Sequence, residues 1–159
     1  MKAISIKNPY ANLIVLGLKP LEIRSKPTKY RGDILICASK NKVLWHHIHN
    51  PKYFIEFATK HDLYCNSGKA IGIATITDCR PMTIEDEAAA FCKYEPGLFA
   101  YALEDPRQIT PFDVCGNVGF FNVDYSIKCC ICDCTIIPNN GYYNHPSGTV
   151  CINCEEKPS

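Results

Sequence analysis

The stretch "SIKNPYANLIVLGLKPLEIRSKPTKYRGDILICAS", Ser5 to Ser39, decides the fold. Apolar and polar residues alternate along "MKAISIK", which predicts a first strand. The Asn-Pro pair that follows predicts a two-turn helix, with Asn8 as its N-cap and Gly17 as its C-cap. Apolar and charged residues alternate again over Leu21–Arg24, and a mostly apolar run leads up to Ser39. The stretch therefore predicts a strand, a short helix and two more strands.

Three charged residues of this stretch, Lys19, Glu22 and Arg24, fall within six positions. Glu22 and Arg24 share one face of the predicted strand because side chains alternate along it. One interpretation is a solvated face with a structural ion pair. The other is a binding site, in which the arginine contacts a phosphate or stacks on a base, the carboxylate accepts a hydrogen bond from a base, and the lysine contacts a phosphate or acts as a base.

The rest of the chain adds more strands than helices. Alternation predicts strands at 69–82, 98–105 and 116–127, and other patterns predict helices at 41–61 and 83–94. Five or six strands with few helices argue against a doubly wound parallel sheet. The sequence predicts an α+β domain over residues 1–126, built around a curved or barrel-like sheet.

Charge and hydropathy narrow the class of protein. No apolar run is long enough for a membrane span, and the N-terminus shows no signal peptide, so we expect a cytoplasmic protein. Residues 1–60 hold eleven of the 17 Lys and Arg residues but three of the 16 acidic ones. A basic half favours a polyanionic partner such as RNA or a nucleotide, although solvated charge is the common alternative.

Residues 127–159 differ in character, since they carry six of the eleven cysteines and no alternating core pattern. Cys129 and Cys132 form one CxxC pair, and Cys151 and Cys154 form another after eighteen intervening residues. This spacing is typical of a structural Zn²⁺ site, in which four thiolates leave no open position. Some thirty residues bury too little to fold alone, and zinc can supply roughly 10–16 kcal/mol to such a segment.

The register of the predicted zinc ligands stays open. Cys130, Cys134 or His145 could replace one of the four cysteines, and free or redox-active thiols are the alternative to zinc. This zinc-ribbon-like segment is also a candidate surface for a protein partner.

The N-terminal residues resemble the ASCH domain, a branch of the PUA-like folds. The resemblance rests on Pro9-Tyr10-Ala11, on Gly17-x-Lys19-x-x-Glu22-x-Arg24, on Arg31-Gly32 and Ala38-Ser39, and on the later pieces "GKAIGIATITDC" and "CGNVGFFNV". It covers most of residues 3–123. The zinc-ribbon-like segment lies outside it.

The resemblance implies a small β-barrel with flanking helices and a cleft beside the charged strand. It implies binding of RNA or of a modified nucleotide, with these ligand-contacting residues: Lys19, Glu22, Arg24, Tyr10, Arg31 and Ser39. The alternative that it raises is a hydrolase, either an amidohydrolase acting on a modified cytidine or a ribonuclease, with Lys19 and Glu22 as catalytic residues. Glu22 stands where the amidohydrolase members carry a threonine, which favours recognition over that chemistry.

Overall fold

The computed structural model describes residues 1–42, 57–125, 127–128, 135–136, 142–145 and 148–151. The chain divides into two compact units, Met1–Val123 and Asp124–Ser159. Each unit is considered by itself below. The domain boundary after residue 126 stays a prediction.

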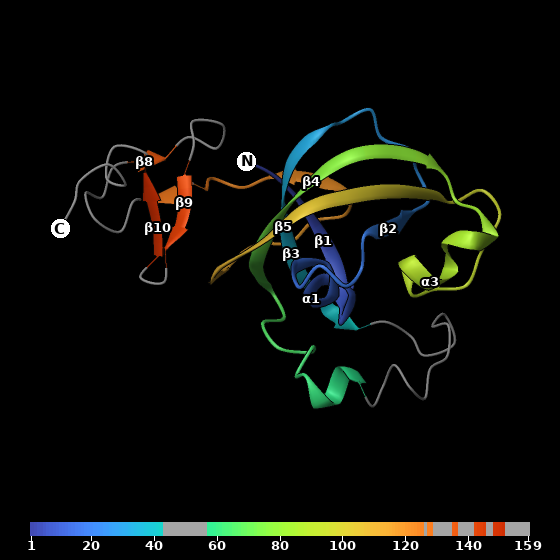
Figure 1. Ribbon diagram of the computed structural model, residues 1–159, viewed down its shortest axis with the longest axis horizontal. Coiled ribbons are helices and arrows are strands. Elements are labelled where there is room, and N and C mark those ends of the chain that lie inside the picture. The colour runs from blue at the N-terminus through green and yellow to red at the C-terminus, as the bar shows by residue number, and fades with distance from the viewer. Residues whose placement is uncertain (43–56, 126, 129–134, 137–141, 146–147, 152–159) are drawn as a thin grey trace. The chain divides into compact units, whose positions relative to one another are not determined.

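The first unit contains most of the regular structure (Figure 1). Its elements in chain order are β1 (Lys2–Asn8), α1 (Tyr10–Val15), β2 (Leu21–Arg24), β3 (Gly32–Lys42), β4 (Lys69–Pro81), the 3-10 turn η2 (Ile84–Asp86), α3 (Glu87–Ala90), β5 (Phe99–Asp113) and β6 (Phe120–Asn122).

Six strands form one sheet in the order β2-β5-β4-β3-β1-β6. β1 and β3 pair in parallel, and the other neighbours are antiparallel. The predicted α+β class is thereby confirmed. Closure into the predicted barrel is not seen, because β2 and β6 are the two edges of this sheet and no ladder joins them within the described residues. Figure 1 shows β4 and β5 as long curved strands beside β1 and β3.

One apolar cluster of the core lies on one face of this sheet, and buried side chains lie on the other face as well. Alternation along the strands sends Ile4 and Ile6 of β1 and Ile34 and Ile36 of β3 into the same apolar cluster. The helix α1 covers the cluster's face of the sheet with Ile14 and its neighbours. A helix of six residues is too short to be stable alone, so burial of its apolar side chains stabilises it.

α1 ends in a hydrogen-bonded reversal that decides where the charged strand begins. Gly17, at φ +75°, donates its N–H to Ile14 O (2.9 Å), and Leu18 donates to Leu13 O (2.9 Å). These two bonds make a Schellman motif, for which glycine is the favoured residue in the left-handed position. Lys19 donates its N–H to Leu13 O as well (3.1 Å), so the reversal fixes the first residue of the charged triplet.

The start of α1 differs from the prediction. Pro9 occupies the N-cap position and no side chain caps the helix, so the assignment of Asn8 as N-cap is wrong. Asn8 is instead fully buried at the end of β1, where its amide donates to Cys65 O and Ser67 Oγ, both at 3.0 Å. Burying the amide next to these acceptors explains why a polar residue precedes the proline.

Three other segments differ from their predicted form. The helix expected at 83–94 is a 3-10 turn and one turn of α-helix, which ends where Phe91 adopts φ +55°. The strand expected at 116–127 is reduced within residues 116–125 to the three residues of β6. Of the helix expected at 41–61, residues 57–60 are helical, 41–42 belong to β3, and 43–56 lie outside the described residues.

The second unit contains four short strands. β7 (Ile127–Lys128) pairs with β8 (Thr135–Ile136), and β9 (Tyr142–His145) pairs with β10 (Gly148–Cys151), both antiparallel. In the described parts of both units, we find no helix with the length and hydropathy needed to cross a membrane.

Gly72 lies where β4 packs closely against α1. A Cβ placed on Gly72 would lie 2.6 Å from the γ-methyl groups of Val15 and 2.7 Å from the carbonyl oxygen of Arg107. Gly72 is not among the glycines with positive φ, so space rather than backbone conformation requires glycine here.

We therefore expect Gly72→Ala to lower the free energy of unfolding by about 1–3 kcal/mol, the usual cost of overpacking a core. Urea denaturation followed by circular dichroism measures this change. A Gly72→Ala protein as stable as the parent chain would contradict the close packing of α1 on β4.

Candidate functional site

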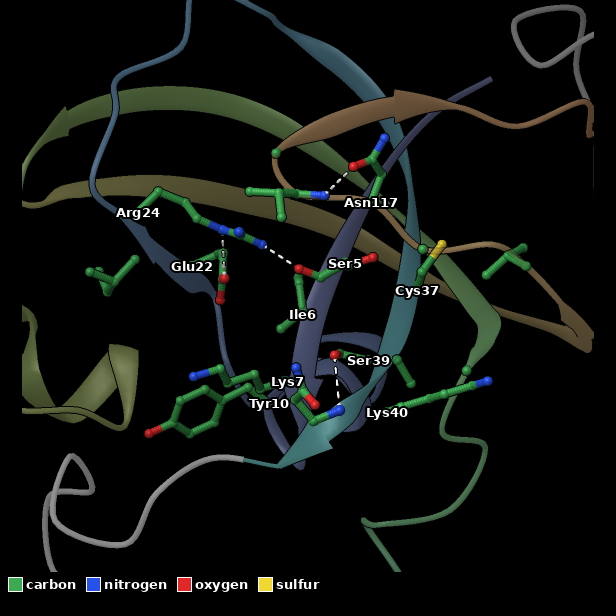
Figure 2. Close-up of a pocket in the computed structure, with 18 of the residues that line it drawn as sticks. Ser5, Ile6, Lys7, Tyr10, Glu22, Arg24, Cys37, Ser39, Lys40 and Asn117 are labelled. Atoms are coloured by element: carbon green, nitrogen blue, oxygen red, sulfur yellow. Dashed lines mark hydrogen bonds and ion pairs between the residues drawn. The ribbon is translucent and has the colours of Figure 1, made fainter.

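The first unit contains a cavity of about 910 Å³, at the upper end of the size range of small-molecule sites. Its walls come from β1, β2 and β3, from the residues around α3, and from the loop 114–119 that leads to β6. Figure 2 shows side chains from β1, β2 and β3 pointing into this space. Segments far apart in the sequence therefore form one site.

Lys19 lies at the floor of the cavity. The residue is 2% exposed, and its ammonium group donates to the carbonyl oxygen of Leu21 and to Glu22 Oε2, the latter at 3.1 Å. Its Nζ also lies 5.0 Å from the centre of the Tyr10 ring, within the range of a cation–π contact. A buried ammonium needs such partners, since an unpaired charge away from water costs several kcal/mol.

Arg24, at the end of β2, completes the floor. Its Nε forms an ion pair with Glu22 Oε1 at 3.1 Å, and its Nη2 donates to Ser5 O at 2.6 Å (Figure 2). Ser5 belongs to β1, which is not a neighbour of β2 in the sheet, so this bond connects two strands that no ladder joins. The charged triplet thus forms a structural ion-pair network and also lines the cavity.

Tyr10 and Cys92 flank Lys19 and line the cavity with it. The Tyr10 hydroxyl donates to Phe91 O at 2.8 Å, and burial, followed by Cys92 and Glu22, raises the pKa of this phenol. Burial also raises the pKa of the Cys92 thiol, while Lys19 lowers it. Both groups are therefore neutral at pH 7, and the fixed charges of the floor are those of Lys19, Glu22 and Arg24.

The mouth of the cavity carries a second group of polar side chains, Lys7, Ser39 and Lys40. Lys7 of β1 is the direct partner of Ser39 in the parallel β1–β3 ladder, and Lys40 follows on β3. Both lysines are exposed, and no ion pair among the described residues involves either. The stem of Lys40 crosses Gly68, where an added Cβ would lie 2.9 Å from its Cε.

Five of the six predicted ligand-contacting residues line this cavity: Tyr10, Lys19, Glu22, Arg24 and Ser39. Arg31 is not part of the lining. It pairs instead with Asp78 at 3.1 Å, and its Nη1 donates to the carbonyl oxygens of Thr28 and Tyr30.

Sequence reasoning missed Lys7, Lys40 and the loop 114–119. Lys7 stands two positions after Ser5 and so shares its face of β1, a signal that alternation could have supplied. The loop has no such signal. Its approach to β1 is close, because a Cβ on Gly116 would lie 2.8 Å from Ser5 Oγ.

The predicted zinc ligands cannot be placed in the same way. Cys129, Cys132 and Cys154 lie outside the described residues, and Cys151 is the last residue of β10, with no description of its side chain. Among the residues whose side chains are described, no group of three or more His, Cys, Asp or Glu could hold a metal ion. The zinc site stays a prediction.

An ion pair outside the cavity holds the segment that brings Ala90 and Cys92 to its wall. Arg80 donates two hydrogen bonds to Asp86, at 2.7 and 2.6 Å, and the backbone N–H of Thr83 donates to the same carboxylate at 2.8 Å. These donors, Arg80 above all, lower the pKa of Asp86 from 3.8 to about 2.

Comparison with known proteins adds the following. A sequence model described as the ASCH domain matches residues 4–156 of the chain. The crystal structure of ASCH from Zymomonas mobilis is similar at a TM-score of 0.50 and 18% identity, over 71% of this chain and 73% of that one. A single-substitution variant of the Zymomonas mobilis protein gives a TM-score of 0.49 at 18% identity, over 71% and 75%. No curated protein matches the sequence.

We expect Asp86→Asn to lower the free energy of unfolding by roughly 1–3 kcal/mol at pH 7, because Arg80 and the Thr83 N–H lose a charged acceptor. A depressed carboxyl pKa stabilises the fold above the unfolded value of 3.8, and this contribution disappears as pH falls toward 2. The difference between variant and parent should therefore shrink below about pH 4 in urea titrations. Glu95→Gln, which changes an exposed carboxylate, is the control. A stability difference between Asp86→Asn and the parent that does not depend on pH would contradict the ion pair of Asp86 with Arg80.

Proposed function

The chain belongs to the ASCH domain family, whose sequence model covers residues 4–156, and from this premise we propose that its cavity binds RNA or a single nucleotide. ASCH domains are generally RNA-binding. The observation that carries the proposal is the charge of the lining: Lys7, Lys19, Arg24 and Lys40 face the space, and Glu22 is the one carboxylate among the described residues that line it. An excess of cations in a concave site attracts a polyanion.

The phosphate belongs at the mouth. Lys7 and Lys40 are exposed there, and no ion pair of theirs is found in the described residues. The Ser39 hydroxyl between them accepts from the N–H of Asn41 at 3.1 Å, so its own proton remains for a phosphate oxygen. Two ammonium groups and a hydroxyl are suitable donors for one phosphate.

The base belongs at the floor, because the cations there are already neutralised in part. Lys19 and Arg24 both pair with Glu22, which leaves one net positive charge among three groups. Such a floor suits the polar edge of a neutral base better than a second phosphate. The ring of Tyr10 adds an aromatic wall beside it.

The hydrolase alternative receives less support. A catalytic base needs a free electron pair, whereas the ammonium of Lys19 donates to Leu21 O and to Glu22. Both bonds use Lys19 as a hydrogen-bond donor, which is the role that recognition gives it. Electrophoresis of the RNA after incubation with the protein would reveal cleavage, which this proposal does not expect.

We expect a fluorescein-labelled single-stranded RNA heptamer of mixed sequence to bind with an affinity that falls as salt rises. Lys7→Ala and Lys40→Ala should each weaken binding and reduce the slope of log Kd against log salt by about 0.7, the value for one phosphate contact on a single strand. Fluorescence anisotropy between 50 and about 300 mM salt measures both effects.

The matched controls are Lys29→Ala and Lys60→Ala, which remove exposed lysines that do not line the cavity. They should leave affinity and slope nearly unchanged. If all four variants weaken binding equally, the RNA contacts a general basic surface and not this cavity.

We also propose a structural Zn²⁺ in the second unit, held by Cys129, Cys132, Cys151 and Cys154. Its support is the spacing of the two CxxC pairs and the β9–β10 hairpin between them, whose last residue is Cys151. Four thiolates suit a closed tetrahedral site, and the metal would supply folding free energy to a unit with short strands.

Metal analysis of the purified full chain should find one zinc per chain, and Cys132→Ser should lower that occupancy. Cys79→Ser, which changes a cysteine of β4, should retain it. Full occupancy in Cys132→Ser would show that this residue is not a ligand.

A further inference from the structure

The floor of the cavity presents a carboxylate with unused acceptor capacity. Glu22 Oε2 accepts a hydrogen bond from Lys19, and Oε1 lies 3.1 Å from Arg24 Nε. That Nε is buried and makes no hydrogen bond among the described residues, so the pair is electrostatic and Oε1 still lacks an aligned donor. An ionised carboxylate has about four acceptor positions. A ligand that donates to Glu22 would use positions that the protein leaves open.

Donors surround this carboxylate. Arg24 Nη2 bonds to Ser5 O, whereas no described partner occupies its Nη1, and Lys19 uses two of its three N–H groups on Leu21 O and Glu22. The floor therefore offers acceptors on Glu22 with donors beside them. The Glu22 side chain is 9% exposed, so a ligand group that reaches it leaves water and must replace its hydrogen bonds.

The four bases differ in what they present to such a floor. The Watson–Crick edge of guanine carries two adjacent donors, N1–H and N2–H₂, next to the acceptor O6. Adenine and cytosine place an acceptor nitrogen next to their amino group, and uracil has one N–H between two carbonyl oxygens. A carboxylate can accept both donors of guanine at once, while the other bases would bring an acceptor against it.

We propose that this cavity selects guanine, with Glu22 accepting from N1–H and N2–H₂ and with Arg24 or Lys19 donating to O6. The inference rests on the proposed function, since it assumes that a nucleotide enters with its phosphate at Lys7, Ser39 and Lys40. In the part of the chain that the structure describes, Glu22 is the one carboxylate that lines the cavity, so the selection depends on this side chain.

The first test needs no variant. Labelled RNA heptamers carry a single guanine, adenine, cytosine or hypoxanthine at the centre of a uridine background, with the all-uridine heptamer as reference. We expect the guanine heptamer to bind roughly 5- to 100-fold more tightly than the reference, the range of one good bidentate contact. Hypoxanthine, which keeps N1–H and O6 but lacks the amino group, should fall between them.

The outcomes separate the two proposals. If no heptamer binds, the proposed function itself fails. If all five bind with the same affinity and the expected salt dependence, the cavity or its surroundings bind RNA but the selection of guanine is wrong. A preference for adenine or cytosine would also overturn it.

A variant then assigns the selection to Glu22. Glu22→Gln keeps the size of the side chain but offers one acceptor and one amide donor, so the advantage of guanine over the reference should fall to within about twofold. Glu95→Gln, exposed and outside the lining, should keep it. Retained guanine preference in a Glu22→Gln protein with a parent-like melting temperature would show that another group reads the base. If Glu22→Gln does not fold, the heptamer series still decides.

Discussion

The carboxylate of Glu22 on the edge strand β2 pairs with Arg24 of the same strand and with Lys19 just before it, and both the sheet and the cavity depend on this arrangement. Without it, Lys19 would be a buried charge whose one remaining hydrogen-bond acceptor among the described residues is a backbone carbonyl. Arg24, paired with the same carboxylate, donates to Ser5 O on β1 and so connects the edge strand β2 to a strand that is not its neighbour in the sheet. One ion-pair network thus connects two strands of an open sheet that are not neighbours and forms the floor of the cavity.

The packing of α1 against β4 decides where this ion-pair network lies. α1 approaches β4 closely because Gly72 has no side chain, and the Schellman motif at Gly17 then turns the chain back so that Lys19 enters the core side. The position of the cavity floor therefore depends on the packing of α1 against β4 and on the turn at Gly17.

Much of the fold was predictable from local patterns. Alternation located the strands around Ile4, Ile34 and Ile73, and the resemblance of the charged triplet to a known motif indicated the family and five side chains of the cavity. Predictions failed where tertiary contacts overrule local preference. Asn8 bonds to Cys65 and Ser67 instead of capping α1. Arg80 and the Thr83 N–H bind Asp86, and the segment after Thr83 forms a 3-10 turn and a four-residue helix rather than a long helix.

The sequence by itself determined which side chains share a face, because the periods of strands and helices are local properties. The α+β class and the shared face of Glu22 and Arg24 on β2 follow from that, whereas the choice between an ion pair and a binding site on this face stayed open. Only the tertiary structure decided that Lys7 lies beside Ser39, that the loop 114–119 closes against Ser5, and that Arg24 reaches β1. The physical reason is that register and loop placement depend on contacts between residues far apart in the chain, which no local pattern encodes.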